Sequence, residues 1–239
     1  DRIRVVDLAN VIAGPSISAM LRRFGMDIIK VDPPDPLYSP EITVLYGLST
    51  NVGKRSVILD VVRQRNAFFA LLATADLLIV NTTDDGMRRL GLTEEQIRDR
   101  FPELIITRFD AWGGPTEEGC QASWLGYDDN LQAASGIMAR YGGGVSTPEE
   151  HAHVGTLDVI SGVAGAAAAL YALYRRQDGV VVEARTSLAT VAQYVQYPFL
   201  MAGEPVCFGG TGPLCRGLRP SYAIYHALDG SVLLTDTNE

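Results

Sequence analysis

The chain has 239 residues, of which 47% are hydrophobic and 20% are charged, a composition typical of a folded globular protein with a sizeable core. Its 28 acidic and 20 basic residues give a formal net charge of −8, which argues against a broad surface for nucleic acid or anionic membrane. Any anionic ligand therefore needs a local basic site.

Short apolar segments alternate with helical segments in the first half of the chain. The expected strands are residues 4–8, 27–31, 56–60, 77–81 and 104–108. Helices are expected at 15–24, 63–75 and 93–101, the last with a capping box formed by Thr93 and Gln96. This alternation predicts an α/β fold, a doubly wound, Rossmann-like parallel sheet with helices on both faces.

The first strand-to-helix turn reads Asn-Val-Ile-Ala-Gly-Pro at residues 10–15, without a Gly-x-Gly-x-x-Gly fingerprint or a Walker lysine. Ligands are still expected at the carboxyl ends of the strands. Two basic pairs, Lys54 with Arg55 and Arg88 with Arg89, flank strands there. They predict a phosphate clamp, with solvated surface residues as the alternative.

The second half of the chain is more helical. A Gly-, Pro- and acid-rich linker is expected at 112–123, and helices are expected from Tyr127 and from about Asp158. A strand at 180–184, a helix at 187–201, a glycine loop at 208–213 and a β-hairpin at 223–234, with Asp229-Gly230 at its turn, should follow. We expect residues 1–203 to form a large domain whose helical part is 124–203, and 204–239 to begin a second, smaller α+β domain.

The apolar stretch from Val159 to Tyr174 is rich in Ala and Gly and shorter than the ~20 residues of a membrane span, so it predicts a buried helix. Because the chain opens on a strand-like segment, we expect no secretory signal. Cys120, Cys207 and Cys215 are odd in number and lack metal-ligand spacing, which indicates reduced thiols in a cytoplasmic protein. We expect no metal site, although His151 and His153 form a His-x-His pair that is open as an alternative.

Asp158 stands at the start of that apolar helix and has two interpretations. Thr156 or Asp158 could be the N-cap, accepting hydrogen bonds from first-turn amides. Alternatively, Asp158 is a nucleophile, since amide donors and the positive end of a helix keep a carboxylate ionised and stabilise an oxyanion forming beside it.

An ordered set of short motifs resembles the class III CoA-transferases, a family that includes formyl-CoA transferase, carnitine CoA-transferase and α-methylacyl-CoA racemase. The matching segments are Val-Ile-Ala-Gly-Pro at 11–15, Ile-Lys-Val-Asp-Pro at 29–33, Lys-Arg-Ser at 54–56, Val-Asn at 80–81 with Arg-Leu-Gly-Leu at 89–92, Gly-Tyr-Asp at 126–128, and Asp158. Six matches in the same order cover most of the chain.

The resemblance implies a function and a set of site residues. Asp158 would attack a donor acyl-CoA, and CoA would pass through an aspartyl thioester to a small carboxylate acceptor, with Tyr127 near the reacting acyl group. The positions that would bind CoA are Val11, Ala13, Lys54, Asn81, Arg89 and Leu90. A glycine lid at Gly209, Gly210 and Gly212 matches more loosely. CoA and acyl-CoA would be substrates, with no permanently bound cofactor.

Residues that differ from the family pattern narrow the range of reactions and substrates that the resemblance implies. Racemases carry histidine where this chain has Tyr127. Because tyrosine has a reference pKa of about 10, it is a poor proton carrier at neutral pH. The difference therefore favours acyl transfer over racemisation. Ile12 replaces a glutamine near the acyl site of the formyl enzyme, which disfavours formate and oxalate as substrates. Asp32-Pro33 stands where that enzyme has arginines near the nucleotide.

Family members are longer and form interlocked dimers, so the resemblance predicts a fragment of a homodimer subunit, or half of a fused pseudo-dimer. The segments Glu-Glu-His-Ala-His-Val-Gly-Thr at 149–156 and Tyr-Asp-Asp-Asn at 127–130 resemble the fused dimethylsulfoniopropionate CoA-transferase/lyases. Three alternatives to plain transfer are therefore an acyl-CoA racemase or isomerase, such a transferase/lyase, and a non-catalytic half of a fused enzyme. No nucleic-acid or membrane partner is expected.

Overall fold

The computed structural model describes residues 2–113, 124–142, 146, 148–150, 155–202 and 216–235. The chain forms two compact units, one of residues 1–128 and 155–191 and the other of 129–154 and 192–239. The predicted division of the chain at 203/204 stays a prediction.

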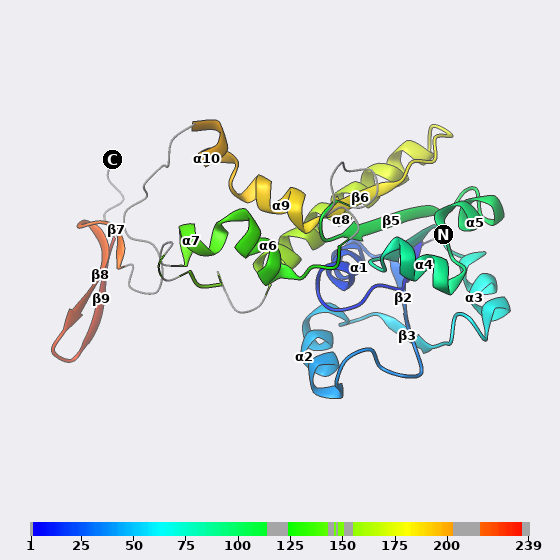
Figure 1. The fold of residues 1–239 in the computed structure, drawn as a ribbon, viewed down its shortest axis with the longest axis horizontal. Helices are drawn as coiled ribbons and strands as arrows, with labels where there is room; N and C mark the ends of the chain where they lie inside the picture. The colour runs from blue at the N-terminus through cyan, green and yellow to red at the C-terminus, as the bar shows by residue number, and fades with distance from the viewer. Residues whose placement is uncertain are drawn as a thin grey trace. The chain divides into compact units, whose positions relative to one another are not determined.

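The first unit is built on a six-stranded parallel sheet (Figure 1). Its strands, in the spatial order β3-β2-β1-β4-β5-β6, are β3 (Arg55–Ile58), β2 (Asp27–Asp32), β1 (Arg4–Asp7), β4 (Leu77–Val80), β5 (Ile105–Asp110) and β6 (Ala184–Ser187). All five pairings are parallel. The predicted doubly wound α/β class is confirmed, and the chain reverses its direction of winding between β1 and β4.

Helices cover both faces of this sheet. On one face lie α3 (Arg65–Leu72), α4 (Asp84–Leu90) and α5 (Glu94–Arg100), which bury Phe68, Met87 and Ile97 against Val6, Leu78 and Ile106. Because successive strand residues alternate faces, the buried Val5 belongs to the opposite face, beside α1 (Ala13–Arg23) and α8 (Thr156–Arg176). Strands buried on both faces explain the continuous apolar runs in the sequence.

Helices α1 and α8 pack closely because α8 carries glycine at the contact. A methyl group added at Gly162 would lie 2.4 Å from Cβ of Ser16, and one at Gly165 would lie 2.5 Å from Cδ1 of Ile17. Helix α8 has 21 residues and is apolar enough to cross a membrane by length and composition. It is longer than expected, and its buried residues pack as a core helix of this unit.

Most of the predicted elements are present with shifted ends. The capping box of α5 is confirmed, with Thr93 Oγ1 accepting from Gln96 N and Gln96 Oε1 accepting from Thr93 N. Two helices were not predicted, α2 (Pro40–Thr50) and α4. The strand expected at 180–184 is instead β6, and the helix expected at 187–201 is divided into α9 (Leu188–Val195) and α10 (Tyr197–Ala202).

The chain from Asp128 onward adds α6 (Asp128–Ser135) and α7 (Ile137–Tyr141), separated by Gly136 with φ 81°. In the second unit, β7 (Gly217–Arg219), β8 (Tyr222–Ala227) and β9 (Gly230–Thr235) form an antiparallel sheet. Ala227 pairs with Gly230, so the predicted hairpin is confirmed, but the prediction of Asp229-Gly230 as its turn is wrong, since the turn residues are Leu228 and Asp229.

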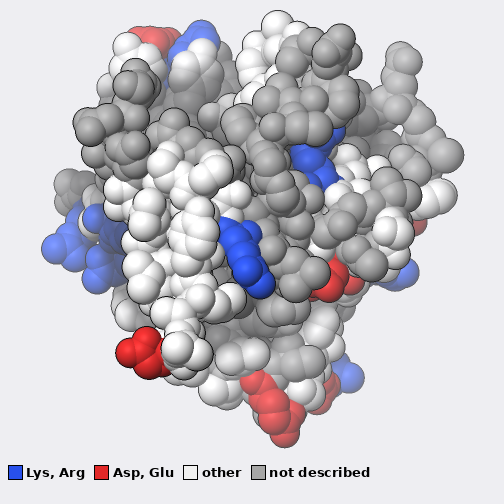
Figure 2. Space-filling view, turned by 90° about the vertical axis from the view of Figure 1, so that its left-hand side faces the viewer, with Lys and Arg blue, Asp and Glu red and all other residues white. Residues whose placement is uncertain are grey.

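Charged side chains are scattered over the face drawn in Figure 2, where the blue and red residues stand singly or in small groups. Among the residues described there, no continuous basic surface is seen, which agrees with the acidic composition. A bound anion would depend on individual buried or half-buried cations.

Candidate active site

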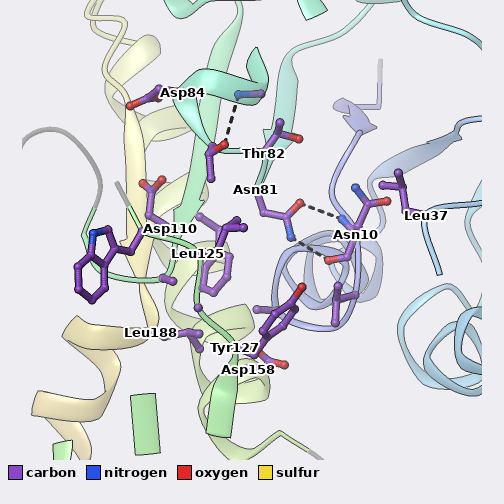
Figure 3. Close-up of a pocket in the computed structure, with 18 of the residues that line it drawn as sticks. Asn10, Leu37, Asn81, Thr82, Asp84, Asp110, Leu125, Tyr127, Asp158 and Leu188 are labelled. Carbon is purple, nitrogen blue, oxygen red and sulfur yellow. Dashed lines mark hydrogen bonds between the residues drawn. The ribbon is translucent and has the colours of Figure 1, made fainter. Parts of the chain in front are cut away.

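Asn10 and Asn81 tie together the two loops where the sheet changes its direction of winding. Asn10 follows β1 and Asn81 follows β4, and these strands are neighbours. The Asn10 backbone N–H donates to Asn81 Oδ1 at 2.9 Å, and Asn81 Nδ2 donates to the Asn10 carbonyl at 2.8 Å (Figure 3). The paired bonds hold both loops in a fixed relation at the place where doubly wound sheets bind ligands.

Val11 has φ 66°, the only positive φ at a non-glycine residue among those described. A β-branched side chain in this region costs about 1–3 kcal/mol, and such strain is typical of ligand-contacting turns. The two hydrogen bonds between Asn10 and Asn81, next to Val11 in the chain, hold this turn in place. Val11 is therefore a strained residue at the entrance to the site predicted from sequence.

A cavity of about 420 Å³ opens at these strand ends and has the volume of a small-molecule site. Six of the eight residues predicted for catalysis and CoA binding line it: Val11, Ala13, Asn81, Arg89, Tyr127 and Asp158. A second cavity of about 390 Å³ is lined by Leu90 and also by Arg89. The structure thus brings together seven predicted residues from segments far apart in the sequence.

Asp158 lies in the first turn of α8 and is 8% exposed. The N-cap is Gly155, with φ 65° and no side-chain cap, so the prediction that Thr156 or Asp158 is the N-cap is wrong. A Cβ at residue 155 would lie 3.0 Å from Asp158 Oδ2, so glycine provides both the turn and the space beside the carboxylate. The backbone N–H of Asp158 donates to Asp128 Oδ2 at 2.7 Å.

Tyr127 and Asp158 are drawn at the same end of the cavity, with Asp84 at the other end (Figure 3). Tyr127 is half-exposed and neighbours Tyr38, another lining residue. Burial, together with the adjoining Tyr127 and Tyr46, raises the pKa of Tyr38 to about 12, so its phenol stays protonated at neutral pH. Tyr38 was not predicted as a site residue, because it lies in a proline-rich loop with no recognisable motif.

Arg89 is the only cation that lines either large cavity among the described residues. It comes from α4, whose N-cap Thr83 accepts from Gly86 N and whose C-cap Gly91 has φ 64°. Arg88, the other member of the predicted basic pair, is exposed and forms an ion pair with Asp85. The helix therefore separates the pair, with Arg89 on the cavity side and Arg88 in solvent.

Lys54 is buried beneath the site and does not line either large cavity. Its Nζ donates at 2.9 Å to each of Asp7 Oδ2, the Pro15 carbonyl and Asn51 Oδ1. Its side chain and that of Asp7 are 1% and 0% exposed, and burial lowers the pKa of Lys54 against the opposing effect of Asp7. All three ammonium donors are engaged inside the protein.

Comparison with known proteins identifies the family. The model of CoA-transferase family III matches residues 1–239. The chain belongs to this family. It is 43% identical over 202 residues to the CoA-transferase/lyase DddD of Marinomonas sp. (strain MWYL1), covering 83% of this chain and 24% of that protein. It is 30% identical to the succinate–glutarate CoA-transferase of Agrobacterium fabrum (strain C58 / ATCC 33970), covering 99% of this chain and 63% of that enzyme.

Solved structures agree with this family III assignment. Rv3272 of M. tuberculosis superposes with a TM-score of 0.80 at 28% identity, over 98% of this chain and 62% of that one. A CAIB/BAIF family protein from Brucella suis gives 0.82 at 25% identity, over 98% and 65%. The chain thus spans about a quarter of one family III relative and just under two thirds of these others.

In this family III chain, a buried ion-pair network stands behind one wall of the cavity. Arg108, 1% exposed, donates to Asp84 at 2.9 Å and to Asp110 at 3.3 Å, and Arg185 donates to Asp110 at 2.9 Å. Both aspartates line the cavity, and neither was predicted. The two arginines neutralise the negative charges of Asp84 and Asp110. The ion pairs hold this wall of the cavity in place, and neither carboxylate is left without a counter-charge.

Glu94 joins the same network from α5. Burial and the nearby Glu183 raise its pKa, outweighing the nearby Arg108, Arg185 and Arg98. Sequence reasoning missed these residues because the network joins strands and helices that are not adjacent in sequence. The predicted lid residues Gly209, Gly210 and Gly212, the three cysteines, His151 and His153 lie outside the described residues. Within the described part, no cluster of three metal-ligating side chains is found.

Proposed function

We propose that the protein is an acyl-CoA:carboxylate CoA-transferase with Asp158 as the covalent nucleophile. The observation that carries this proposal is the position of Asp158. A nearly buried carboxylate in the first turn of a long helix lines a ligand-sized cavity at the switch point of the sheet. The positive end of the helix favours the ionised, attacking form of Asp158. Membership of CoA-transferase family III supports the same chemistry.

Each step of the proposed mechanism forms one bond to a carbonyl carbon and releases one leaving group. An Asp158 carboxylate oxygen attacks the thioester carbonyl of the donor, CoA thiolate leaves, and an acyl-aspartyl anhydride forms. The thiolate then attacks the aspartyl carbonyl, releasing the donor acid and leaving an aspartyl-CoA thioester. An acceptor carboxylate displaces the thiolate to form a new anhydride, and thiolate attack on its acyl carbonyl releases the product and free Asp158. Each difficult exchange is thereby divided into easier acyl transfers.

CoA is assigned to the two large cavities. They share Arg89, Asn10, Thr82 and Gly86 among their lining residues, so they adjoin one another. Val11 and Ala13 would contact the pantetheine, Asn81 and Leu90 the nucleotide, and Arg89 a phosphate through its planar guanidinium. Lys54 is proposed to act indirectly, by holding the loop at Pro15 and Asn51, because its donors are already engaged.

Tyr127 favours transfer over racemisation. It lines the cavity with Asp158 at the position where the racemases carry histidine, and a tyrosine hydroxyl is suited to donating a hydrogen bond to an oxygen of the substrate. We assign Tyr127 to contact the acyl carbonyl oxygen. A racemase would instead exchange the α-proton of the substrate without a carboxylate acceptor.

The deciding experiment incubates the complete protein with a panel of acyl-CoAs and traps the product with hydroxylamine or borohydride. Mass spectrometry then locates the modified residue. We expect modification of Asp158 that is lost in Asp158→Asn, whereas Asp129→Asn, a change at an exposed carboxylate, keeps it. Intact CoA binding without modification by any donor would refute the covalent mechanism.

A second candidate is a CoA-transferase/lyase that acts on dimethylsulfoniopropionate. The favouring observation is the aromatic lining of the cavity by Tyr38, Phe109, Trp124 and Tyr127, since aromatic faces attract a sulfonium cation. The 43% identity to a CoA-transferase/lyase supports it further. Release of dimethyl sulfide from dimethylsulfoniopropionate and acetyl-CoA would establish this candidate, and its absence would leave plain transfer.

The proposed function also includes where the enzyme is located and how its subunits assemble. We place the enzyme in the cytoplasm, as a homodimer or a fused pseudo-dimer, with no permanently bound cofactor. Light scattering of the complete protein distinguishes the two, because a homodimer has twice the mass of its chain, whereas a fused pseudo-dimer has the mass of one chain.

A further inference from the structure

Helix α4 is short, but it carries Arg89, the cation that lines both large cavities. It has 7 residues, and isolated helices shorter than ~12–15 residues are marginal in water, so contacts from other elements must hold it. Among the described residues, no hydrogen bond or ion pair fixes the Arg89 side chain itself. The direction of this guanidinium therefore depends on how the backbone of α4 is held.

The first half of α4 is anchored by buried groups. Met87 is 1% exposed and belongs to the core on this face of the sheet. Asp84, the first residue of the helix, accepts a hydrogen bond from the buried Arg108 at 2.9 Å. Arg89 lies toward the other end of the helix, so it depends on how that end is held.

Arg65 holds the C-terminal end of α4 from α3. Its Nη1 donates to the Gly91 carbonyl at 2.7 Å, and its Nη2 donates to the Leu90 carbonyl. The last carbonyls of a helix have no partner within it, and a cation beside them interacts favourably with the helix dipole. Arg65 thus supplies the donors that this helix end lacks, at the carbonyls of the two residues that follow Arg89.

Gly91 provides the room for this contact. Its φ of 64° is the left-handed conformation that ends α4, and a Cβ there would lie 2.8 Å from Arg65 Nη1 and 2.9 Å from Nη2. The ring centroid of Phe69 lies 5.8 Å from the guanidinium carbon of Arg65 and adds a cation–π contact. The guanidinium is therefore held at the helix end by groups from both α3 and α4.

We propose that Arg65 is a positioning residue for CoA binding, which holds the end of α4 so that Arg89 is directed toward a phosphate of the ligand. This inference rests on the proposed function, in which Arg89 binds that phosphate. Arg65 lines neither large cavity, so it acts on the ligand only through α4. A guanidinium suits this role, because its rigid fork of donors can hold two carbonyls at once.

The test is a double-variant cycle in which titration calorimetry measures the affinity of the complete protein for CoA. Arg65→Met should weaken binding about fivefold when Arg89 is present, as part of the loss of about tenfold that removal of Arg89 itself causes. In the Arg89→Met background, Arg65→Met should change the affinity by less than about twofold, because the group that it positions is gone. Arg65→Lys keeps a cation at the carbonyls and should give an intermediate affinity.

Arg100 provides a matched control. Its guanidinium carbon lies 4.6 Å from the ring centroid of Phe69, so it stacks on the same ring as Arg65. No hydrogen bond from Arg100 to α4 is found within the described part of the chain. Arg100→Met should therefore leave the affinity for CoA within about twofold in both backgrounds.

A second variant breaks the contact without removing a charge. In Gly91→Ala the new Cβ would displace the Arg65 guanidinium. The variant should weaken CoA binding when Arg89 is present and have little effect in the Arg89→Met background. It decides the question if Arg65→Met does not fold.

The outcomes distinguish this inference from the proposed function. Absence of CoA binding by the wild type, or of any acyl-CoA label on Asp158, would refute the transferase function itself. In a protein that binds CoA and is labelled, an Arg65→Met loss of equal size in both backgrounds would show that Arg65 only stabilises the fold, and it would overturn the positioning role. Unchanged affinity in both backgrounds would overturn it as well. At saturating acyl-CoA, the labelling rate of Arg65→Met should equal that of the wild type, since only binding is affected.

Discussion

The backbone N–H of Asp158 donates a 2.7 Å hydrogen bond to the carboxylate of Asp128, a residue 30 positions earlier in the chain. Both residues are buried. A first-turn amide of α8 is thereby satisfied by a distant side chain, since Gly155 has no side chain to cap the helix. The carboxylate of Asp158 need not serve as the cap of its own helix.

Asp128→Ala removes this acceptor and should lower the free energy of unfolding by about 1–3 kcal/mol, the cost of an unsatisfied buried amide. It should also slow labelling of Asp158, because the first turn of α8 loses its anchor. Asp128→Asn keeps a carbonyl oxygen and should retain most of the stability. Urea denaturation and the labelling rate measure both effects, and equal behaviour of all three proteins would contradict this role.

Arg89 and Arg88 provide a matched pair for testing the proposed CoA site. Arg89 lines both large cavities, whereas Arg88 is in solvent beside Asp85. Arg89→Met should weaken CoA binding about tenfold or more through loss of a charge-assisted contact, and Arg88→Met should change it by less than about twofold. Titration calorimetry with CoA gives both values. Similar losses in the two variants would mean that only net charge matters.

Lys54 and Asp7 form a buried ion pair that supports the Val11 loop. Removing one partner leaves the other charge buried, so Lys54→Met or Asp7→Asn alone should lower the free energy of unfolding by about 3–5 kcal/mol. The double variant should lose less than the sum of the two. If Lys54→Met instead remains fully stable and binds CoA poorly, Lys54 contacts CoA directly.

Asp27 should make stability depend on acid pH. Burial acts to raise its pKa, but hydrogen bonds and charge from Arg55 and Arg4 together lower it below the usual value. A folded-state pKa below the unfolded value contributes stability above pH about 4 that is lost as the pH falls through the folded pKa. Asp27→Asn should therefore show a shallower loss of stability on acidification than the wild type.

Thermal unfolding at a series of pH values measures this difference. Asp178→Asn, a substitution at an exposed residue just after α8, is the control and should follow the wild-type curve. A wild-type slope in Asp27→Asn would show that the Arg55 and Arg4 bonds do not persist in solution.

Local sequence determined the alternation of strands and helices, because the apolar runs and the Thr93–Gln96 capping box involve residues close together in the chain. It did not reveal α2, since this helix has apolar residues such as Val44 and Leu48 exposed rather than on one buried face. Residue patterns pointed to Asp158 and Arg89, motif resemblance added Tyr127, and each lines the cavity.

Only the tertiary structure decided which of the predicted residues line the cavity. Lys54 and Arg89 look alike in the sequence, as basic residues at strand ends. The fold turns Arg89 into the cavity and buries Lys54 against Asp7, which lies 47 residues earlier. The Asp128–Asp158 bond and the Arg108 network likewise depend on side chains from separate elements. Local patterns determine the elements, whereas burial and pairing between distant segments determine the chemistry of the site.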